Sequence, residues 1–256
     1  MKSAYTAATL VKGLEALEAL SQVEASGLTE LAQRLKLPGP TLFRLLATLA
    51  AQGYVQKSPD SRYRLTLKAW EIGARVVGRM PLRELARPFL ERLGTQTRET
   101  VHLSVKDGDG IVIVDKVDSP HPVRVDTYVG QRAPLHCSAT GKAFLAFAPD
   151  GLNGAVLARY TAATITDRGA LDRELAEVRR TGWARNREEW REGVCAVAVP
   201  VRDGRDAVPA VLSLTLPTLR FAPDVVRRKL VPALKASGAA LSAELRRASG
   251  RDYPNG

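Results

Sequence analysis

Side chains that suit contacts with nucleic acid gather between residues 40 and 64. Arg44 can bind a guanine edge or a phosphate, Thr41 can hydrogen-bond to either, and Phe43 can contact a thymine methyl group. The basic side chains that follow suit phosphate contacts, which set affinity and register but carry no sequence information. The predicted DNA-binding residues are Pro40, Thr41, Phe43, Arg44, Thr48, Lys57, Arg62 and Arg64. Two plainer explanations stay open: Phe43 packs against a neighbouring helix, and the charged hairpin is merely solvated.

A second group of residues has the chemistry to hold a small anion. Residues 138–141 precede a helix expected over 142–147, and backbone N–H groups at a helix N-terminus favour a carboxylate. In a later strand, alternation places Ser213 and Thr215 on one face, where both can hydrogen-bond to a bound acid. The alternative is that these two hydroxyls lie on a solvated sheet face.

Other reactive side chains fit no catalytic or metal-binding pattern. Lys142 is not a phosphate-loop lysine, because that motif needs glycine where the chain has His136 and serine or threonine where it has Ala143. Adjacent residues on an extended segment point apart, so His136 and Cys137 are not expected to form a nucleophile pair. His102 is interpreted as a hydrogen-bonded histidine within a sheet, and the scattered cysteines and histidines lack metal-ligand spacing. No catalytic residue, metal or cofactor is predicted.

The elements that carry the first group follow the order of a winged helix-turn-helix. Apolar spacing predicts a helix over 8–21 and a second helix capped by Thr29. Pro40 suits the first position of a third helix, because its missing N–H would be unpaired there. Residues 54–57 and 62–65 are expected strands joined by a turn. The predicted inward-facing residues are Leu10, Leu14, Leu17 and Ser21, with Val11 and Leu20 widening their stripe, and then Leu28, Leu31, Leu35, Leu42, Leu45, Leu46 and Leu49.

The elements after residue 65 mix helices with strands. A helix over 66–79 carries Leu67, Trp70, Ala74 and Val77 on one stripe, and the next helix is expected to end at Gly94. A hairpin and further separate strands favour an α+β fold over strict βαβ alternation. The remaining predicted strands cover 100–106, 111–116, 123–129, 195–201 and 209–217, and the remaining helices cover 142–147, 170–181 and 224–247, the last capped by Asp224.

Composition agrees with a globular, basic protein. The 256 residues are 45% hydrophobic and 25% charged, with a formal net charge of +11. Residues 33–79 hold nine basic side chains against two acidic ones, a local excess that suits a polyanion, although an arginine-rich surface is also what a GC-rich genome produces. No apolar run approaches the ~20 residues of a membrane span. Glu15 and Glu18 make the N-terminus unlike a signal peptide, so a cytoplasmic location is expected.

Three segments resemble the IclR-type transcriptional regulators and follow in that family's order. The first is LAQRLKLPGPTLFRLLATLAAQGYVQKSPDSRYRL and the second is GQRAPLHCSATGKAFLAFAP. The third is GWARNREEWREGVCAVAVPVRDG followed by VPAVLSLTLPTLRF, which is similar to the family's signature region. Together these matches cover nearly the whole chain, which is more specific than one motif.

The resemblance implies a domain plan and partners. It implies a winged helix-turn-helix DNA-binding domain over 1–66, a linker helix over 67–80, and a GAF-like effector-binding domain with a mixed or antiparallel sheet over 81–256. The implied partners are a double-stranded DNA operator, a small organic-acid effector and further copies of the chain in a homodimer or homotetramer, with no membrane. The implied effector-binding residues are Leu135, Ser138, Ala139, Thr140, Gly141, Asn186, Val194, Ala196, Ser213 and Thr215.

Two positions depart from the family's pattern. The family often has cysteine at the position of Ala196, whereas Cys195 here comes one residue earlier and would face the other way. Asn186 stands where some members carry an acid. We therefore expect a ligand-responsive transcriptional regulator whose effector cannot be copied from another member. Two other classes remain as alternatives: a partner-binding winged-helix module, and an enzyme acting on a small acid.

Overall fold

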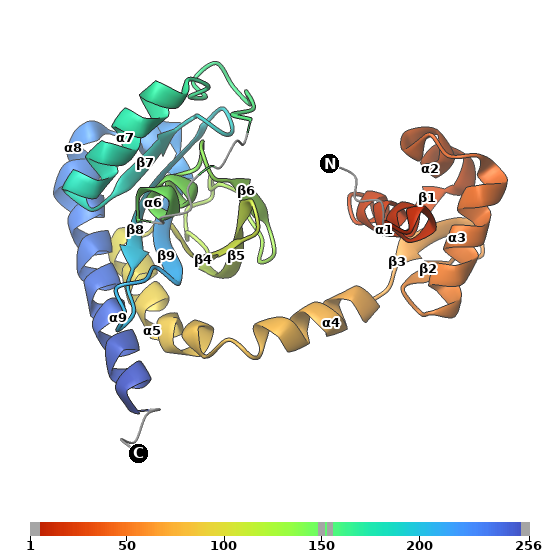
Figure 1. The fold of residues 1–256 in the computed structure, drawn as a ribbon, viewed down its shortest axis with the longest axis horizontal. Coiled ribbons are helices and arrows are strands. Elements are labelled where there is room, and N and C mark those ends of the chain that lie inside the picture. Colours follow the sequence, from red (N-terminus) through yellow and green to blue (C-terminus); the bar gives the residue numbers. More distant parts are fainter. Residues whose placement is uncertain (1–5, 148–151, 153–155, 252–256) are drawn as a thin grey trace. The chain divides into compact units, whose positions relative to one another are not determined.

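The computed structural model describes residues 6–147, 152 and 156–251. Residues 1–5 and 252–256 of the expected domain ranges lie outside that part. The chain divides into two compact units, Met1–Arg79 and Met80–Gly256, whose elements are labelled in Figure 1.

The N-terminal unit is a winged helix-turn-helix, as predicted. A three-stranded antiparallel sheet in the order β1-β3-β2 forms the wing beside three helices. The strand β1 was not predicted; it pairs Ser26 with Tyr63 and Gly27 with Arg62. The elements are α1 (Ala8–Leu20), β1 (Ser26–Gly27), α2 (Leu28–Leu35), α3 (Gly39–Ala51), β2 (Val55–Lys57), β3 (Arg62–Leu65) and α4 (Lys68–Val77).

The core of this unit uses only part of the stripe predicted on α1, since Leu20 is buried and Leu17 packs half-buried against the core. Leu10 and Leu14 are exposed, and the buried positions of α1 are Gly13, Ala16, Ala19 and Leu20. The helix is apolar on two sides. The side with the small residues packs on the core because small side chains let the helix approach it closely. The inward leucines of α3 are as predicted, with Leu42, Leu45 and Leu46 buried.

Two helix starts and one helix face in this unit also need correction. The second helix begins at Leu28, not after a Thr29 cap, because Gly27 is held extended by its strand pairing and serves as the N-cap. The third helix begins at Gly39, so Pro40 occupies its second position. The predicted apolar stripe of α4 has no buried residue within the described chain, and Trp70 is 65% exposed.

The C-terminal unit is built on one antiparallel six-stranded sheet in the order β6-β5-β4-β9-β8-β7. This confirms the α+β fold, and of the two expected sheet arrangements, mixed or antiparallel, the sheet is antiparallel. The elements are α5 (Pro81–Thr97), β4 (Thr100–Asp107), β5 (Gly110–Val117), β6 (Arg132–Pro134), α6 (Ala139–Phe147), α7 (Arg168–Thr181), β7 (Ala184–Arg187), β8 (Val194–Val201), β9 (Ala210–Pro217), a 3-10 turn (Thr218–Arg220), α8 (Pro223–Val225), a π-helical segment (Val226–Leu230) and α9 (Val231–Arg251).

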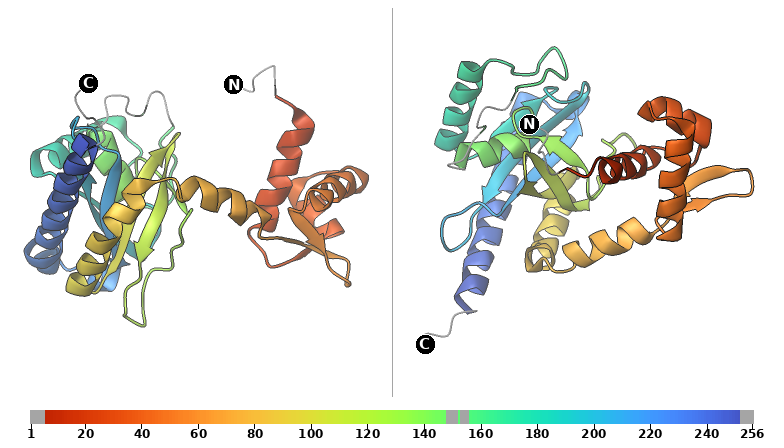
Figure 2. Two further views of the ribbon diagram at one scale, coloured as in Figure 1. Left: turned by 90° about the horizontal axis from the view of Figure 1, so that it is seen from below. Right: turned by 45° about the vertical axis from the view of Figure 1, so that its right-hand side comes forward.

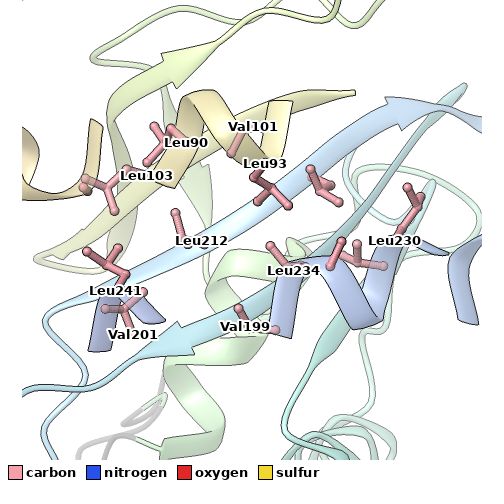
Figure 3. Close-up of a cluster of buried hydrophobic side chains, with 14 of the residues drawn as sticks. Leu90, Leu93, Val101, Leu103, Val199, Val201, Leu212, Leu230, Leu234 and Leu241 are labelled. Atoms are coloured by element: carbon pink, nitrogen blue, oxygen red, sulfur yellow. The ribbon is translucent and has the colours of Figure 1, made fainter. Parts of the chain in front are cut away.

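Helices cover both faces of this sheet. The two long helices α5 and α9 lie side by side on one face, where Leu212, Leu214 and Leu216 of β9 join the main core (Figures 2 and 3). The shorter helices α6 and α7 pack on the opposite face, over Ala196 and Ala198 of β8. Because side chains alternate along a strand, the polar residues of β9 face α6 and not the main core.

In the C-terminal unit three predictions are wrong in detail and one strand was not predicted. Gly94 does not end a helix: it lies inside α5, where an added Cβ would come within 2.9 Å of Val117 Cγ1. Residues 123–129, predicted as a strand, form none, and the strand that pairs with β5 on that side is β6. The strand β7 was missed. The C-terminal helical run starts at Pro223 with Ala222 as N-cap, so Asp224 lies in its first turn.

Candidate DNA-binding face and ligand cavity

The outer face of α3 presents the side chains predicted to read DNA. Phe43 is 50% exposed, and Arg44 is exposed with no hydrogen bond or ion pair to its guanidinium within the described residues. Thr41 is half-buried at the N-terminal end of the helix, and Thr48 is exposed but donates its hydroxyl to the Arg44 carbonyl at 2.9 Å. Because the leucines of α3 point into the core, Phe43 lies on the opposite side of the helix, and half of its side chain stays exposed.

The wing adds basic side chains that differ in the contacts they already make within the unit. Arg62 and Arg64 are on the same exposed face of β3, as predicted. Arg62 is already engaged, because its Nη2 donates to the Ala25 carbonyl at 2.7 Å and lies 3.7 Å from a Glu30 carboxylate oxygen. Arg64 makes a longer hydrogen bond to Gln56, at 3.3 Å, and the Lys57 ammonium lies over the Tyr63 ring. Lys57 and Arg64 are therefore the freer cations of the wing.

The C-terminal unit contains a cavity of about 50 Å³ on the α6 face of the sheet. That volume accommodates several water molecules. Eight of the ten predicted effector-binding residues line it: Ser138, Ala139, Thr140, Asn186, Val194, Ala196, Ser213 and Thr215. Ten further lining residues were not predicted: His102, Ser104, Ile111, Ile113, Val125, Thr127, Gln131, Ala133, Trp190 and Arg191.

Leu135 and Gly141 do not line the cavity. The Leu135 side chain is buried in the hydrophobic cluster under α6. Gly141 gives its N–H to Ser138 Oγ at 3.0 Å, and an added Cβ would lie 2.2 Å from the Leu135 carbonyl oxygen. The two residues therefore pack the start of α6 against the preceding chain, a task that only glycine allows at position 141.

The N-terminus of α6 offers unpaired donors to the cavity. The backbone N–H groups of Ala139 and Thr140 make no hydrogen bond within the described part of the chain, whereas those of Gly141 and Lys142 bond to Ser138. Ala139 is buried and Thr140 is half-buried, and both line the cavity. Unpaired N–H groups at a helix start, together with the helix dipole, attract a negatively charged ligand group.

His102 is buried at the sheet side of the cavity and linked to two threonines. Its Nε2 lies 2.9 Å from Thr127 Oγ1 and its Nδ1 lies 3.3 Å from Thr215 Oγ1. Burial, followed by the charge of Lys116, lowers the pKa of His102 to about 4. The imidazole is neutral at neutral pH, with one ring nitrogen donating and the other accepting. The hydrogen-bonded sheet histidine predicted from the sequence is found here, but its position on the cavity wall was missed.

A buried ion pair ties α6 to the loop on the other side of the cavity. Lys142 is fully buried, and its Nζ lies 2.7 and 2.9 Å from the Glu189 carboxylate oxygens and 3.3 Å from a Glu174 oxygen. Glu189 also donates its backbone N–H to Asn186 Oδ1 at 2.9 Å. Since Asn186 and Trp190 line the cavity, this pair fixes two of its walls relative to each other.

The thiol and histidine next to the cavity show no nucleophilic arrangement. Burial raises the pKa of the Cys137 thiol to about 12, so the thiolate is not populated at neutral pH. His136 makes its hydrogen bond to the Ala158 carbonyl at 2.9 Å, not to Cys137. Among the described residues no group of three or more histidine, cysteine or acidic side chains could hold a metal ion. No helix in that same part of the chain is long and apolar enough to cross a membrane.

Comparison with known proteins places both units in one family. Residues 9–59 match the IclR helix-turn-helix domain, and residues 74–243 match the bacterial transcriptional regulator IclR C-terminal family. The HTH-type transcriptional regulator KdgR of Escherichia coli K12 is 35% identical over 259 residues, covering 99% of this chain and 97% of KdgR. The DNA-binding transcriptional repressor YiaJ of the same organism is 34% identical over 247 residues, covering 93% and 87%.

Solved structures show the same likeness. The Thermotoga maritima IclR structure has a TM-score of 0.74 and 29% identity, covering 93% of this chain and 98% of that one. An IclR homologue from Microbacterium hydrocarbonoxydans, crystallised with 4-hydroxybenzoate, has a TM-score of 0.77 and 27% identity, covering 94% and 100%. The winged helix, the cavity-bearing antiparallel domain and these matches together lead to one conclusion: the chain belongs to the IclR family of DNA-binding transcriptional regulators.

Proposed function

We propose that α3 enters the major groove of a double-stranded operator and reads it with Thr41, Phe43 and Arg44. The observation that carries this proposal is the exposed outer face of α3, where the Arg44 guanidinium has no partner within the described residues. The N-terminal part of a recognition helix contacts base edges in helix-turn-helix proteins. Pro40 and Thr48 border this face, and Lys57, Arg62 and Arg64 contact phosphates from the wing, Arg62 least of the three.

The C-terminal cavity binds a small organic acid whose carboxylate meets the start of α6. Unpaired N–H groups of Ala139 and Thr140 support this orientation, since they are donors without a partner at the positive end of a helix. The 4-hydroxybenzoate complex of the Microbacterium homologue supports a small acid as the ligand class. Ser213 and Thr215 face the bound acid from β9, and Val194 and Ala196 supply apolar contact.

The protein works as a homodimer, or as a tetramer of two dimers, in the cytoplasm with its DNA. Leu10 and Leu14 on α1, and Leu67, Trp70 and Val76 at α4, are large apolar side chains that remain exposed. Exposed apolar side chains of this size are suited to contacts with another copy of the chain. Residues 1–66 act as the DNA-binding domain, 67–80 as the linker and 81–256 as the effector-binding domain.

The acid regulates DNA binding by preferring one arrangement of the assembled copies. A ligand shifts such an equilibrium only by its difference in affinity for the two states. The acid therefore alters operator affinity when it binds best to an arrangement that does not fit the operator. In such an arrangement the two recognition helices do not lie at the half-site spacing of the operator. The C-terminal unit is then a binding domain and not an enzyme.

A titration against the DNA upstream of the chain's own gene and the adjacent operon tests the proposal. The purified full chain is titrated at two salt concentrations, with and without a panel of small organic acids, against a random duplex as control. Site-specific, salt-sensitive binding that at least one acid alters is expected. Binding no tighter than to random DNA, on these fragments and then on genome-selected ones, would contradict it.

A further inference from the structure

The cavity is smaller than an aromatic acid. Its volume of about 50 Å³ holds a few water molecules, whereas an apolar cavity of about 150 Å³ is the size that binds benzene. Ligand sites in proteins usually measure about 300–1,000 Å³. An acid as large as the 4-hydroxybenzoate of the Microbacterium complex therefore fits only if one wall of the cavity moves.

An open hollow of about 400 Å³ shares a wall with the cavity. Among the described residues, two line both spaces: Ala133 on β6, and Trp190 in the loop between β7 and β8. The methyl group of Ala133 moves only with its backbone, which is paired with β5. Trp190 is half-buried, and its large side chain can rotate about its own bonds. The indole of Trp190 is therefore the part of the shared wall that can move.

The loop that carries Trp190 is anchored on either side of the tryptophan. The backbone N–H of Gly193 donates to the Glu188 carboxylate at 2.8 Å, and the Glu189 carboxylate is paired with the buried Lys142. Trp190 itself makes no hydrogen bond among the residues that the structure describes. The backbone on both sides is thus held by polar contacts, whereas the indole is held by packing alone.

The shape of the loop does not depend on the position of the indole. Glu188 and Gly193, which flank Trp190, both have left-handed backbone conformations, with φ of 59° and 74°, and these turn the chain. The guanidinium of Arg191 lies 4.5 Å from the centre of the Trp190 ring, but Arg191 is exposed, so this cation–π contact is weak. A swing of the indole breaks that contact and no hydrogen bond.

We propose that Trp190 is the gate of the ligand cavity. With its indole in place the cavity is closed against the hollow, and with the indole displaced the two spaces join into one site of ligand size. This inference rests on the proposed binding of an acid at the start of α6. The ligand enters through the hollow, its carboxylate meets the Ala139 and Thr140 N–H groups, and the rest of it takes the space that the indole leaves.

A thiol placed inside the cavity tests the gate without any acid. Ala196 lines the cavity and not the hollow, so the variant A196C is treated with methyl methanethiosulfonate and its modification is followed by intact mass. The wild-type chain, whose Cys137 and Cys195 are buried, gives the background rate. Minor conformations are typically populated at about 0.1–10%, so removal of the gate in W190A/A196C should speed the reaction about tenfold or more over A196C.

The variant W183A/A196C is the matched control. Trp183 is a half-buried tryptophan just before β7, and it lines neither the cavity nor the hollow. This variant should react at the rate of A196C. Equal rates in A196C and W190A/A196C, or the same acceleration in both tryptophan variants, would overturn the gate. If W190A/A196C has no cooperative melting transition, W190F/A196C decides: its smaller ring should still speed the reaction, and an unchanged rate would overturn the gate.

Acid binding gives a second readout of the gate. For each acid that alters operator binding, stopped-flow association should be faster with W190A than with the wild-type chain, and the gain should grow with the size of the acid. An aromatic acid that associates with both chains at one rate would contradict the gate. If no acid binds either chain, the acid-binding proposal fails, whereas the thiol rates still decide whether Trp190 closes the cavity.

Discussion

The two candidate sites of this protein differ in where their side chains point, outward from one helix or inward to a cavity. The outer face of α3 is formed by consecutive turns of one helix, and its side chains point away from the core with few partners of their own. The ligand cavity points inward and draws on β4, β5, β8, β9, the start of α6 and the loop before β8. The first site needs only a stable helix behind it, whereas the second requires several distant segments to be held in register.

This difference determines whether a substitution at each site affects binding alone or the stability of the fold as well. A substitution on the outer face of α3 is expected to change DNA binding and to leave the fold intact, since surface changes rarely alter stability by more than about 0.5 kcal/mol. A substitution that leaves a buried charge around the cavity without its partner is expected to destabilise the fold as well.

Replacing Lys142 by methionine should destabilise the C-terminal unit by about 3–5 kcal/mol, because it leaves the carboxylates of Glu189 and Glu174 without their buried cation. Urea unfolding followed by tryptophan fluorescence of Trp183 and Trp190 measures the loss. The variant K106M, at an exposed lysine of the β4–β5 hairpin, is the control and should change little. The double variant K142M/E189M should recover part of the loss. An unchanged midpoint in K142M would show that the ion pair does not hold the cavity walls.

Replacing Arg44 by alanine should weaken operator binding about 10- to 100-fold, or ~1–3 kcal/mol, the usual value of a side chain that reads a base. Acid binding and the unfolding midpoint should stay unchanged, since the guanidinium is exposed. Fluorescence anisotropy with a labelled operator provides the readout. Arg228, whose side chain is 85% exposed on the other unit, gives the control variant R228A. Equal losses in the two variants would argue for a general charge effect in place of recognition by α3.

His102 should make stability fall in mild acid. Its pKa is about 4 in the folded chain against an ordinary 6.5, so the unfolded chain takes up a proton first and stability is lost as pH falls from about 6.5 toward 4. Between pH 7 and pH 5.5 the wild-type chain should lose about 1 kcal/mol more than the variant H102N. Chemical unfolding at both pH values measures the difference. Parallel losses would mean that folding does not lower the pKa of His102.

Replacing Lys57 by alanine should have the smallest effect. A phosphate contact contributes to operator and random DNA alike, so both affinities should fall several-fold while their ratio holds. The slope of log affinity against log salt should decrease by about 1. K106A is the matched control on the other unit. A changed preference for the operator would instead place Lys57 at a base edge.

The sequence predicted which side chains of α3 face outward better than it predicted the lining of the cavity, for a physical reason. Residues of one helix face follow a spacing of 3.6, so the positions of Leu42, Leu45 and Leu46 place Phe43 and Arg44 outside. The cavity depends on pairing across long stretches of chain: His102 meets Ser213, and Thr127 meets His102. Alternation showed which face Ser213 and Thr215 occupy, but it did not reveal that Ser104 would face the same space.

Other errors come from features that spacing does not encode. The buried residues of α1 include the small side chains of Ala16 and Ala19, whereas Leu10 and Leu14 remain exposed. Lys142 sits in an apolar helical run, which signals a buried lysine, but its partner Glu189 lies far along the chain. Gly94 reads as a helix end, and only the packing of Val117 against it shows a different role.

If the cavity and the α3 face are coupled, the acid and the operator must change each other's affinity by the same factor. The affinity of the most effective acid is measured by calorimetry on the free chain and on the chain saturated with operator. Operator affinity is measured with and without saturating acid. A coupled regulator must show the same factor in both pairs, typically 5- to 150-fold. Acid that binds with one affinity to free and operator-bound chain, or operator binding that no acid changes, would contradict the account.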